Sequence, residues 1–476
     1  MNIYNEIQSA FPEIAIPNIS DYYTREIEAA KRVYQGSPPW KRVRSAGLKK
    51  KTRDRALLNA AKVVCDKMAA LTYSEQCEIA ASKAEYQKII MDVLDENAFQ
   101  SKFPEWLSRA YAMGGGILKL RIDCGEIKID YLNADVFFPT KWNNRRISEG
   151  IFRSSYVRNG RFYRLYEYQR ITPKGVEIQN SAWESEEKNS LGTQVGIKSL
   201  FPECEEKCCF SGFKKPFFVY FKPAIGNNRC FDTPLGLPIF ANSYNTLEGL
   251  DIIFDSLQRE YILGKKRIIV PSELVKTEYD GENGENVRMF DAEDEVYQAL
   301  TCDEASKMQI FDNTVQLRVQ EHIDGLNTLL DILSLQIGLS AGSLSFNSKE
   351  GLKTATEVVA DERDTQRTVE NNKNIVGEVI KDLCEGIIAA WCSLNGRTPQ
   401  ECDYTINWHD NVISDDDTRI QQNIELVNAG LRSRISAIMN IDGISEEEAA
   451  RELEKIDGEA ANGGSVDDLL GGGADE

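Results

Sequence analysis

Histidine is almost missing from this sequence, which holds only His322 and His409 in 476 residues. Neither stands near a serine or cysteine in a recognisable nucleophile context, so a histidine-based hydrolase is not expected. No apolar stretch reaches the length that spans a bilayer, which argues against a pore in a lipid membrane. A glycine-rich loop ending in Gly-Lys-Ser or Gly-Lys-Thr is also missing, so the chain is not expected to hydrolyse ATP.

Basic residues are too few to balance the acidic ones. The sequence has 56 Lys and Arg against 75 Asp and Glu, a formal net charge of −19. Duplex DNA is held mainly by basic side chains that neutralise phosphates, so a tight grip on DNA along the whole surface is not expected. The local exception is a basic run over residues 41–55. It could touch phosphate or an acidic neighbour, but a solvated loop is the simpler interpretation.

Metal and cofactor sites are not predicted either. Cys204, Cys208 and Cys209 form the one cluster among eleven cysteines, without the paired spacing or nearby histidine of a zinc site. We expect these thiols in or beside a loop before a strand at 217–221. Scattered cysteines, and a start at residues 1–6 without a basic or apolar leader, predict a reducing cytosol. The glycine triplet 114–116 follows a helix and precedes a strand, the wrong order for a phosphate cradle.

The length predicts two or more subdomains, and the pattern predicts an α+β fold that is mainly helical. An N-terminal arm over residues 1–40 should be anchored by Tyr22, Tyr23, Tyr34 and Trp40. A sheet sandwiched between helices explains the aromatic residues near Tyr166 more simply than a platform for single-stranded nucleic acid. Helices are predicted over 56–71, 85–97, 105–113, 239–263, 317–337, 354–391, 414–430 and 445–456. Strands are predicted over 117–122, 126–131, 151–157, 161–168, 217–221 and 404–408, with Asn159-Gly160 as a hairpin turn.

The stretch 317–391 organises the chain. Apolar residues from Val319 to Ile337 recur at helical spacing on one face, and Gly338 to Gly342 end that helix. The helix after residue 354 stays polar through Asn372 and has almost nothing to bury in its own domain. A helix that is polar nearly all round bridges solvent or packs against other chains. We therefore expect a helical hairpin whose tip meets something outside the monomer.

Several short motifs resemble one family in their order and spacing. They are Asn227-Asn228, Asp232-Thr233-Pro234-Leu235-Gly236, Gly264-Lys265-Lys266-Arg267-Ile268 and Thr354-Ala355-Thr356-Glu357-Val358. The chain resembles the portal proteins of tailed bacteriophages, especially those of siphophages of Gram-positive hosts, from about residue 34 to about residue 450. The resemblance implies a wing (1–238), a first stem helix (239–264), a small α/β clip (265–315), a second stem helix (316–340) and a tunnel loop (341–353). The remaining implied parts are a long helix and return to the wing (354–412), crown helices (413–457) and a disordered acidic tail (458–476).

The resemblance also implies which residues act. The tunnel loop would contact DNA, and the clip would bind partner proteins through acidic side chains. The residues are Leu344, Ser345, Phe346, Asn347, Ser348 and Lys349 in the loop; Glu278, Asp280, Glu282 and Glu285 in the clip; and Lys265, Lys266 and Arg267 in the stem. From the residues alone, Leu344 and Phe346 fit an exposed loop tip and a cap on the hairpin's own core equally well.

The implied function is a ring of about twelve subunits, or about thirteen, at one capsid vertex, through which double-stranded DNA enters and leaves the virion. Implied partners are the terminase large subunit, the head-tail adaptor, the major capsid protein and the scaffolding protein, with no membrane, cofactor or enzymatic activity. Two other classes stay open. Asp410 and Asp415 to Asp417 could form a metal-dependent nuclease site, although acidic residues at a helix N-terminus are common without a metal. A head-assembly scaffold without a channel would share the helices.

Overall fold

The computed structural model describes residues 3–461 except 20–21, 45–51, 74–76, 145, 189, 203, 212, 214, 264–267, 270–276, 281–284, 289–310, 313–315, 346–354, 409–415 and 443–445. The chain divides into two compact units, residues 1–407 and 408–476. The fold mixes helices and small sheets, so the α+β class is confirmed, with roughly half of the described residues helical. No helix among the described residues is both long enough and apolar enough to cross a membrane.

The larger sheet of the first unit is antiparallel, in the order β10-β9-β8-β7-β6, with β11 also paired to β9. Its strands are β6 (Phe137–Asn143), β7 (Arg146–Arg158), β8 (Arg161–Thr172), β9 (Gly175–Ser185), β10 (Thr193–Val195) and β11 (Lys207–Ser211). Asn159 and Gly160, both with positive φ, join β7 to β8 as predicted. Cys208 and Cys209 lie on β11 and not in a loop.

The two faces of this sheet are covered differently. Phe138 and Ile151 pack with Ile7 and Tyr22 of the N-terminal segment. Phe137 and Phe152, their neighbours in sequence, pack with Ile117 and Phe218 of a second sheet. That sheet has the order β12-β4-β5, from β4 (Gly116–Asp123), β5 (Glu126–Asn133) and β12 (Phe218–Phe221). The expectation of helices on both faces was therefore wrong, because side chains alternate along a strand and the second face is aromatic enough to bury another sheet.

The N-terminal segment lies over the body as expected. It contains α1 (Ile3–Ala10), the π-helix η1 (Tyr23–Glu28) and α3 (Ala29–Tyr34). Tyr22 and Tyr23 are buried, and their hydroxyls donate to the carbonyl oxygens of Gly236 and Phe137. The Tyr34 hydroxyl lies 3.1 Å from Ser108 Oγ. The predicted anchors are confirmed by these contacts.

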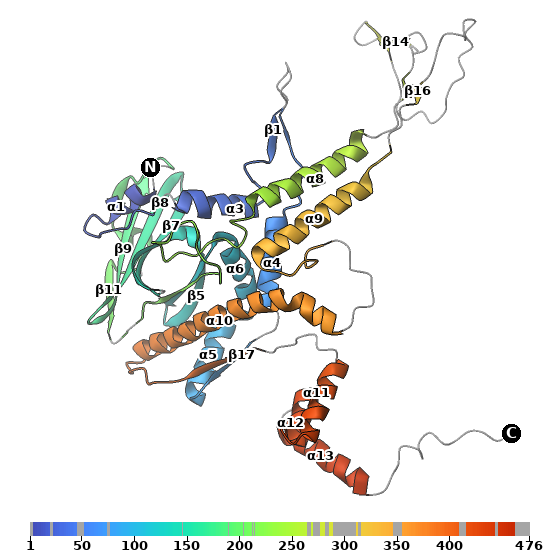
Figure 1. Cartoon of the computed structure of the whole chain (residues 1–476). Coiled ribbons are helices and arrows are strands. Elements are labelled where there is room, and N and C mark those ends of the chain that lie inside the picture. The colour runs from blue at the N-terminus through green and yellow to red at the C-terminus, as the bar shows by residue number, and fades with distance from the viewer. Residues whose placement is uncertain are drawn as a thin grey trace, which may run out of the picture. The chain divides into compact units, whose positions relative to one another are not determined.

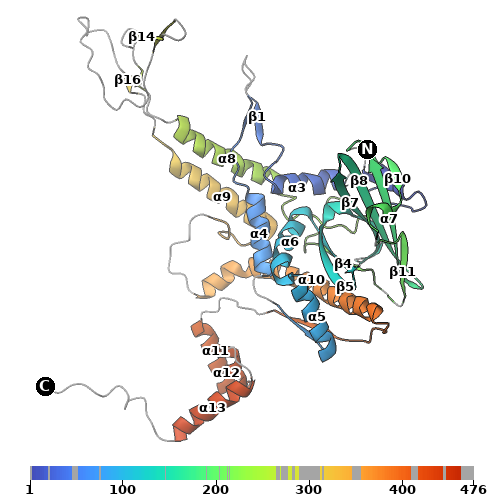
Figure 2. The ribbon, with the colours of Figure 1, turned by 180° about the vertical axis from the view of Figure 1, so that it is seen from behind.

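A helical layer connects the sheets to the rest of the unit (Figures 1 and 2). It consists of α4 (Ala60–Thr72), α5 (Ala84–Glu96), α6 (Phe99–Met113) and α10 (Ala355–Leu394), with β17 (Tyr404–Asn407) paired to β3 (Glu78–Ala81). Asn59 and Ala98, both left-handed, precede α4 and α6. They explain two wrong boundaries, since α4 starts four residues later and α6 six residues earlier than predicted.

Two helices leave this layer side by side, α8 (Tyr244–Leu263) and α9 (Val319–Ile337). The sequence between these two helices contains two short strand pairs. In one, β13 (Ile268–Ile269) pairs with β16 (Phe311–Asp312), and in the other, β14 (Thr277–Asp280) pairs with β15 (Glu285–Arg288). The acidic stretch expected as a turn is therefore largely a hairpin.

The second unit contains α11 (Asp416–Asn428), α12 (Arg434–Asp442) and α13 (Glu446–Ala461). Helix α12 was not predicted, and α13 continues past Gly458, where a disordered tail was expected to begin.

Candidate functional site

The helix pair α8–α9 is antiparallel and is fixed by hydrogen bonds at both ends. At one end the Thr246 hydroxyl donates to Gln336 Oε1 at 2.9 Å. At the other end Glu260 faces His322 at 2.8 Å and accepts from Arg318. The helices approach closely because small residues face the partner: a Cβ on Gly249 would stand 3.1 Å from a Leu329 methyl carbon.

The outer end of this pair is charged. The bond from His322, and then those from Arg318, hold the pKa of Glu260 at about 2. His322, predicted to be a packing or polar-face residue, is therefore a polar link between the helices. A carboxylate that accepts several hydrogen bonds stays ionised, so Glu260 keeps its ion pair with Arg318 at neutral pH.

The predicted apolar stripes are only partly buried within the chain. The buried members are Leu247 and Leu250 of α8 and Leu326, Leu330, Leu333 and Ile337 of α9. Tyr261 is 52% exposed, and it is the last of the predicted apolar stripe of α8, which consists of Leu247, Leu250, Phe254, Leu257 and Tyr261. Ile262 and Leu335, which lie outside the stripes, are 64% and 74% exposed. Ile262 lies near the Glu260–His322 end of the pair and Leu335 near the Thr246–Gln336 end, so they are two separate exposed positions and not one patch.

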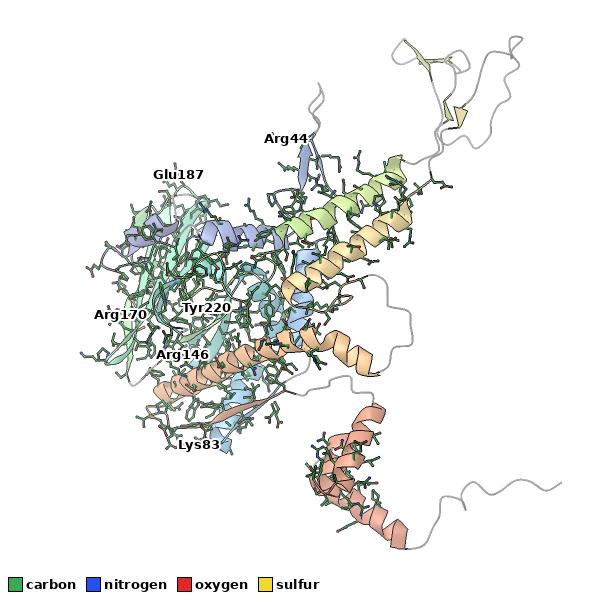
Figure 3. The ribbon with its side chains drawn as sticks, viewed as in Figure 1. Arg44, Lys83, Arg146, Arg170, Glu187 and Tyr220 are labelled. Carbon is green, nitrogen blue, oxygen red and sulfur yellow. The ribbon has the colours of Figure 1, made fainter. Side chains whose placement is uncertain are left out.

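The basic run forms a hairpin beside α8, made of β1 (Arg42–Arg44) and β2 (Thr52–Asp54). Arg53 makes a bidentate pair with Asp255, at 2.7 and 2.6 Å, which lowers the pKa of that carboxyl. Arg55 lies 3.7 Å from Glu248 of α8. The solvated-loop interpretation was therefore wrong for these two arginines, whereas Arg44 points away from the body (Figure 3).

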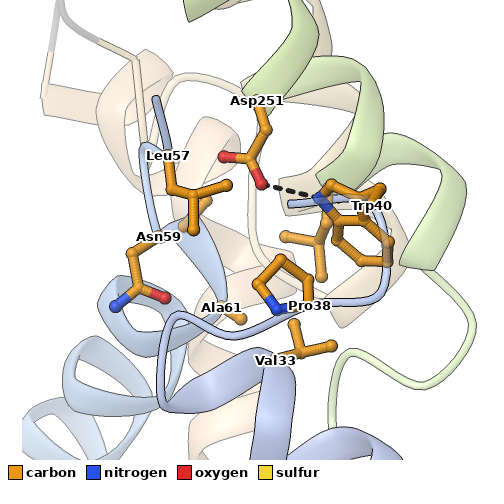
Figure 4. Close-up of a pocket in the computed structure, with 9 residues that line it drawn as sticks. Val33, Pro38, Trp40, Leu57, Asn59, Ala61 and Asp251 are labelled. Carbon is orange, nitrogen blue, oxygen red and sulfur yellow. Dashed lines mark hydrogen bonds between the residues drawn. The ribbon is translucent and has the colours of Figure 1, made fainter. Parts of the chain in front are cut away.

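Asp251 fixes the base of this hairpin. Its carboxylate accepts from the Trp40 indole N–H and the Leu58 backbone N–H, both at 2.8 Å (Figure 4). Burial raises its pKa. The adjoining cavity, lined by Val33, Pro38 and Leu57 among others, has a volume of about 10 Å³. It accommodates no more than a water molecule, so it is not a ligand site.

The loop after α9 has a fixed base. Gly338 ends the helix with φ of 81°, and the Gly342 N–H donates to Asp331 at 2.7 Å. Lys67 of α4 donates to the Ser343 carbonyl oxygen. Leu344 and Ser345 are half-buried. Phe346, Asn347, Ser348 and Lys349 lie outside the described residues, so the predicted exposed tip is not tested there.

The polar half of α10 holds the same loop. Thr365 Oγ1 accepts from the Ser340 N–H at 2.8 Å, and Thr368 Oγ1 donates to the Gly338 carbonyl oxygen at 2.6 Å. Asn372 is buried and accepts from the Ala224 N–H at 3.1 Å. The expectation that this half has almost nothing to bury in its own domain was therefore partly wrong, because its hydroxyl and amide groups hold two loops of the same chain.

Asn227, in the first motif of the resemblance, fixes the segment that precedes α8. Asn227 accepts from the N–H groups of Arg229 and Cys230, both at 3.0 Å, and donates to Tyr22 and Leu235. Gly236 lies against Gly114, where an added Cβ would stand 2.3 Å from the Gly114 carbonyl oxygen. Only glycine fits this contact. Tyr220, labelled in Figure 3, accepts from the Gly236 N–H at 3.2 Å.

Other predicted residues are only partly placed. Glu278 and Asp280 lie on β14 and Glu285 on β15, with Asp280 opposite Glu285. Glu282, Lys265, Lys266 and Arg267 lie outside the described residues. Among the residues that are described, no three His, Cys, Asp or Glu side chains gather as metal ligands. Asp410 and Asp415, part of the alternative nuclease site, are not among them.

The sequence and the structure are similar to known proteins over most of the chain. The family described as "Phage portal protein, SPP1 Gp6-like" matches residues 15–463. No curated protein matches the sequence. Two of the solved structures that are similar to it each share 11% sequence identity with it. One is from the "Virion of native gene transfer agent (GTA) particle", with a TM-score of 0.42 over 80% of this chain and 88% of that chain. The other is from the "Neck of empty GTA particle computed with C6 symmetry", with a TM-score of 0.41 over 93% and 98%.

The family match includes the paired helices, the loop after α9 and the long helix α10, and it confirms the portal resemblance. The narrower expectation of a siphophage of a Gram-positive host stays a prediction. The chain therefore belongs to the SPP1 Gp6-like family of phage portal proteins and is a component of the virion portal.

Proposed function

We propose that the chain assembles into a closed ring of about twelve, or about thirteen, subunits around a channel for double-stranded DNA. The observation that carries this proposal is the family match over residues 15–463, on a chain whose paired helices α8 and α9 leave apolar side chains exposed. Head-to-tail contacts between copies close into a ring when the rotation per subunit divides a full turn. The exposed Ile262 and Leu335 are candidate contributors to such contacts.

Within this ring, residues 341–353 form the tunnel loop that contacts DNA. The bonds of Gly342 to Asp331 and of Ser340 to Thr365 support this assignment, since they give the loop a fixed base. Each subunit carries a formal charge of −19, which disfavours adhesion of phosphates to the channel. Leu344, Phe346, Asn347 and Lys349 would supply the few local contacts, without reading sequence.

Residues 265–315 form the clip, at the end of the helix pair away from the tunnel loop. Glu278, Asp280, Glu282 and Glu285 face the terminase large subunit or the head-tail adaptor. The β14–β15 hairpin supports this role because it presents three of these acids on one short ribbon. Replacing the hairpin by a short glycine linker should leave rings intact and abolish binding of the purified partners. Rings without the hairpin that bind both partners would contradict this assignment.

The remaining partners are the major capsid protein and the scaffolding protein, and the chain acts without catalysing a reaction. Negative-stain imaging of the purified protein tests the ring directly. We expect rings with a central hole, and no cleavage of plasmid DNA when Mg²⁺ is added. Compact particles without a hole would favour a scaffold, and Mg²⁺-dependent cleavage lost in Asp416→Asn would favour a nuclease.

A further inference from the structure

The β1–β2 hairpin has two faces with different contacts. Side chains alternate along a strand, so the paired residues of β1 and β2 alternate between the faces. Arg53 binds Asp255 of α8 through two hydrogen bonds, so the face that contains Arg53 and Val43 is turned to the helix. The opposite face is exposed, and we call it the outer face of the hairpin. Its members are Arg42, Arg44, Thr52 and Asp54.

The outer face carries positive charge that α8 does not neutralise. Arg44 is exposed and points away from the body (Figure 3). Arg42 lies 3.8 Å from Asp54, but its side chain stays 80% exposed, and a surface ion pair of this kind contributes little. The outer face thus holds two arginines against one aspartate. Arg44 is the charge that it presents to a partner.

Helix α9 presents the opposite charge. Its sequence from Val319 to Ile337 contains no lysine or arginine. Glu321 and Asp324 are exposed and lie about one turn apart, and we call them the acidic face of α9. Arg318 interacts with Glu321 electrostatically, whereas the carboxylate of Asp324 accepts from the neutral Gln320 amide at 2.9 Å. Asp324 is therefore the acid that this face offers to a partner.

The hairpin and α9 lie on different sides of α8. The α8 residues that bind the hairpin and its flanking residues recur at steps of three and four, and they are Glu248, Asp251 and Asp255. The α8 residues that contact α9 recur at the same steps, and they are Thr246, Gly249 and Ile253. The two sets are offset by two residues, which is about 200° around a helix. Helix α8 therefore stands between the hairpin and α9 (Figures 1 and 2).

The outer face and the acidic face also lie at the same level along the helix pair. The register of the pair is set by the contacts of Gly249 with Leu329 and of Ile253 with Gly325. In this register Asp255, which binds Arg53, lies level with the turn of α9 that contains Asp324. Both surfaces belong to the first unit of the chain. When such helix pairs stand side by side, the outer face of one meets the acidic face of the next.

Charge favours a second copy of the chain as the partner. Each copy has a formal charge of −19, so two copies repel each other unless opposite charges meet at their contact. The two surfaces supply those charges on opposite sides of the helix pair, as head-to-tail contacts in a ring require. DNA fits the outer face less well, because Asp54 stands beside its arginines and would repel phosphates.

We propose that the outer face of the hairpin in one subunit docks on the acidic face of α9 in the neighbouring copy, with Arg44 donating to Asp324. This inference rests on the proposed ring and adds a surface that joins neighbouring helix pairs. The hairpin then makes the same type of contact on both faces, an arginine with a helix carboxylate, within its own chain through Arg53 and between chains through Arg44. Because the contact is exposed and charged, added salt weakens it.

The first test measures proximity in the full-length chain. Arg44→Cys and Asp324→Cys are introduced together, and the assembled protein is treated with a short bismaleimide, since an arginine–carboxylate pair spans more than a disulfide does. Each copy then offers one new thiol to each neighbour, so a denaturing gel should show a ladder of covalent multimers. Either substitution alone should give no ladder beyond that of wild type, whose exposed Cys124 and Cys209 set the background. Rings without a ladder would overturn the proposal.

The second test exchanges the charges. Arg44→Glu and Asp324→Arg should each raise the concentration midpoint of ring assembly about fivefold in sedimentation velocity, because attraction at the contact becomes repulsion. The two together restore opposite charges and should return the midpoint toward that of wild type. Arg158→Glu makes the same charge change at the exposed end of β7 and should leave the midpoint unchanged. A double variant as weak as the single variants would contradict the pairing.

The remaining outcomes point to other roles or to another assembly. Thermal unfolding of the monomeric variants should match that of wild type, because both side chains are exposed. If Arg44→Glu assembled normally but lowered DNase-protected DNA per head, the hairpin would bind phosphate and the proposal would fall. Wild-type rings with unaffected charge variants would defeat this inference alone. Absence of any wild-type ring would instead defeat the proposed function.

Discussion

Lys119 of β4 forms a nearly buried ion pair that links the two sheets, because its partner Glu167 lies on β8. Its ammonium is 2.7 Å from Glu167, whose other oxygen accepts from Gln169 at 2.6 Å. The Lys119 side chain is 10% exposed and that of Glu167 18%. Burial opposes ionisation of Glu167, yet the charge and hydrogen bond of Lys119 hold the pKa of this carboxyl below its ordinary value.

Lys119→Ala should therefore destabilise the first unit by about 3–5 kcal/mol, since it leaves Glu167 buried without a cation. The double substitution Lys119→Met, Glu167→Leu should cost far less, because neither charge then remains. Urea denaturation followed by tryptophan fluorescence measures both. A double variant as unstable as Lys119→Ala would show that packing and not charge dominates at this position.

Glu260 predicts a pH dependence. Its pKa in the folded chain is about 2, below the ordinary glutamate value of 4.5. A depressed carboxyl pKa adds stability that is fully present above pH ~4.5 and is lost as pH falls toward ~2. Wild type should therefore be more stable than Glu260→Gln at neutral pH, and the difference should shrink between these two values. Denaturation series at several pH values measure it. Glu321→Gln, in the first turn of α9, is the control, because it removes one acidic group near this end without touching Glu260.

At the scale of single elements, the bonds from α10 to the loop predict a local effect. Thr365→Val together with Thr368→Val leaves the Ser340 N–H and the Gly338 carbonyl oxygen without their partners. Each unpaired buried group lowers the stability of the folded loop by about 1–3 kcal/mol. The effect is local because the loop can unfold while the core stays folded. Limited proteolysis should cut residues 338–345 several-fold faster than in wild type. In the control variant Thr328→Val, on the exposed side of α9, the protease should cut residues 338–345 at the wild-type rate.

The sequence predicts those elements whose apolar residues keep one period over many residues. Helices α8, α9 and α10, and the hairpin at Asn159-Gly160, follow from this signal within a few residues. The β1–β2 hairpin was missed because its strands, Arg-Val-Arg and Thr-Arg-Asp, are short and charged, and are held by Asp255 of a distant helix. The loop base was missed for a similar reason, since Thr365 and Ser340 meet only in the folded chain.

At the scale of the whole molecule, the tunnel-loop assignment predicts separate effects on assembly and on DNA. Leu344→Asp with Phe346→Asp, or Lys349→Glu alone, should leave ring assembly near normal, because surface loops bury little. DNA packaging should fall severely, measured as DNase-protected DNA per head. Packaging at wild-type yield would remove this loop from the channel. Loss of the ring would instead show that Leu344 and Phe346 cap the hairpin's own core.

The attachment of α8 to α9 at both ends has a mechanical consequence. A helix of 20 residues is ~30 Å long and resists stretching, because every turn is braced by backbone hydrogen bonds. Two such helices joined at Thr246–Gln336 and at Glu260–His322 cannot slide past each other without breaking those bonds. If the residues between β13 and β16 moved along the helix axes, the helix pair would therefore transmit most of that movement to Gly338. In the proposed ring, a force applied at the clip end of the pair would therefore reach the loop after α9.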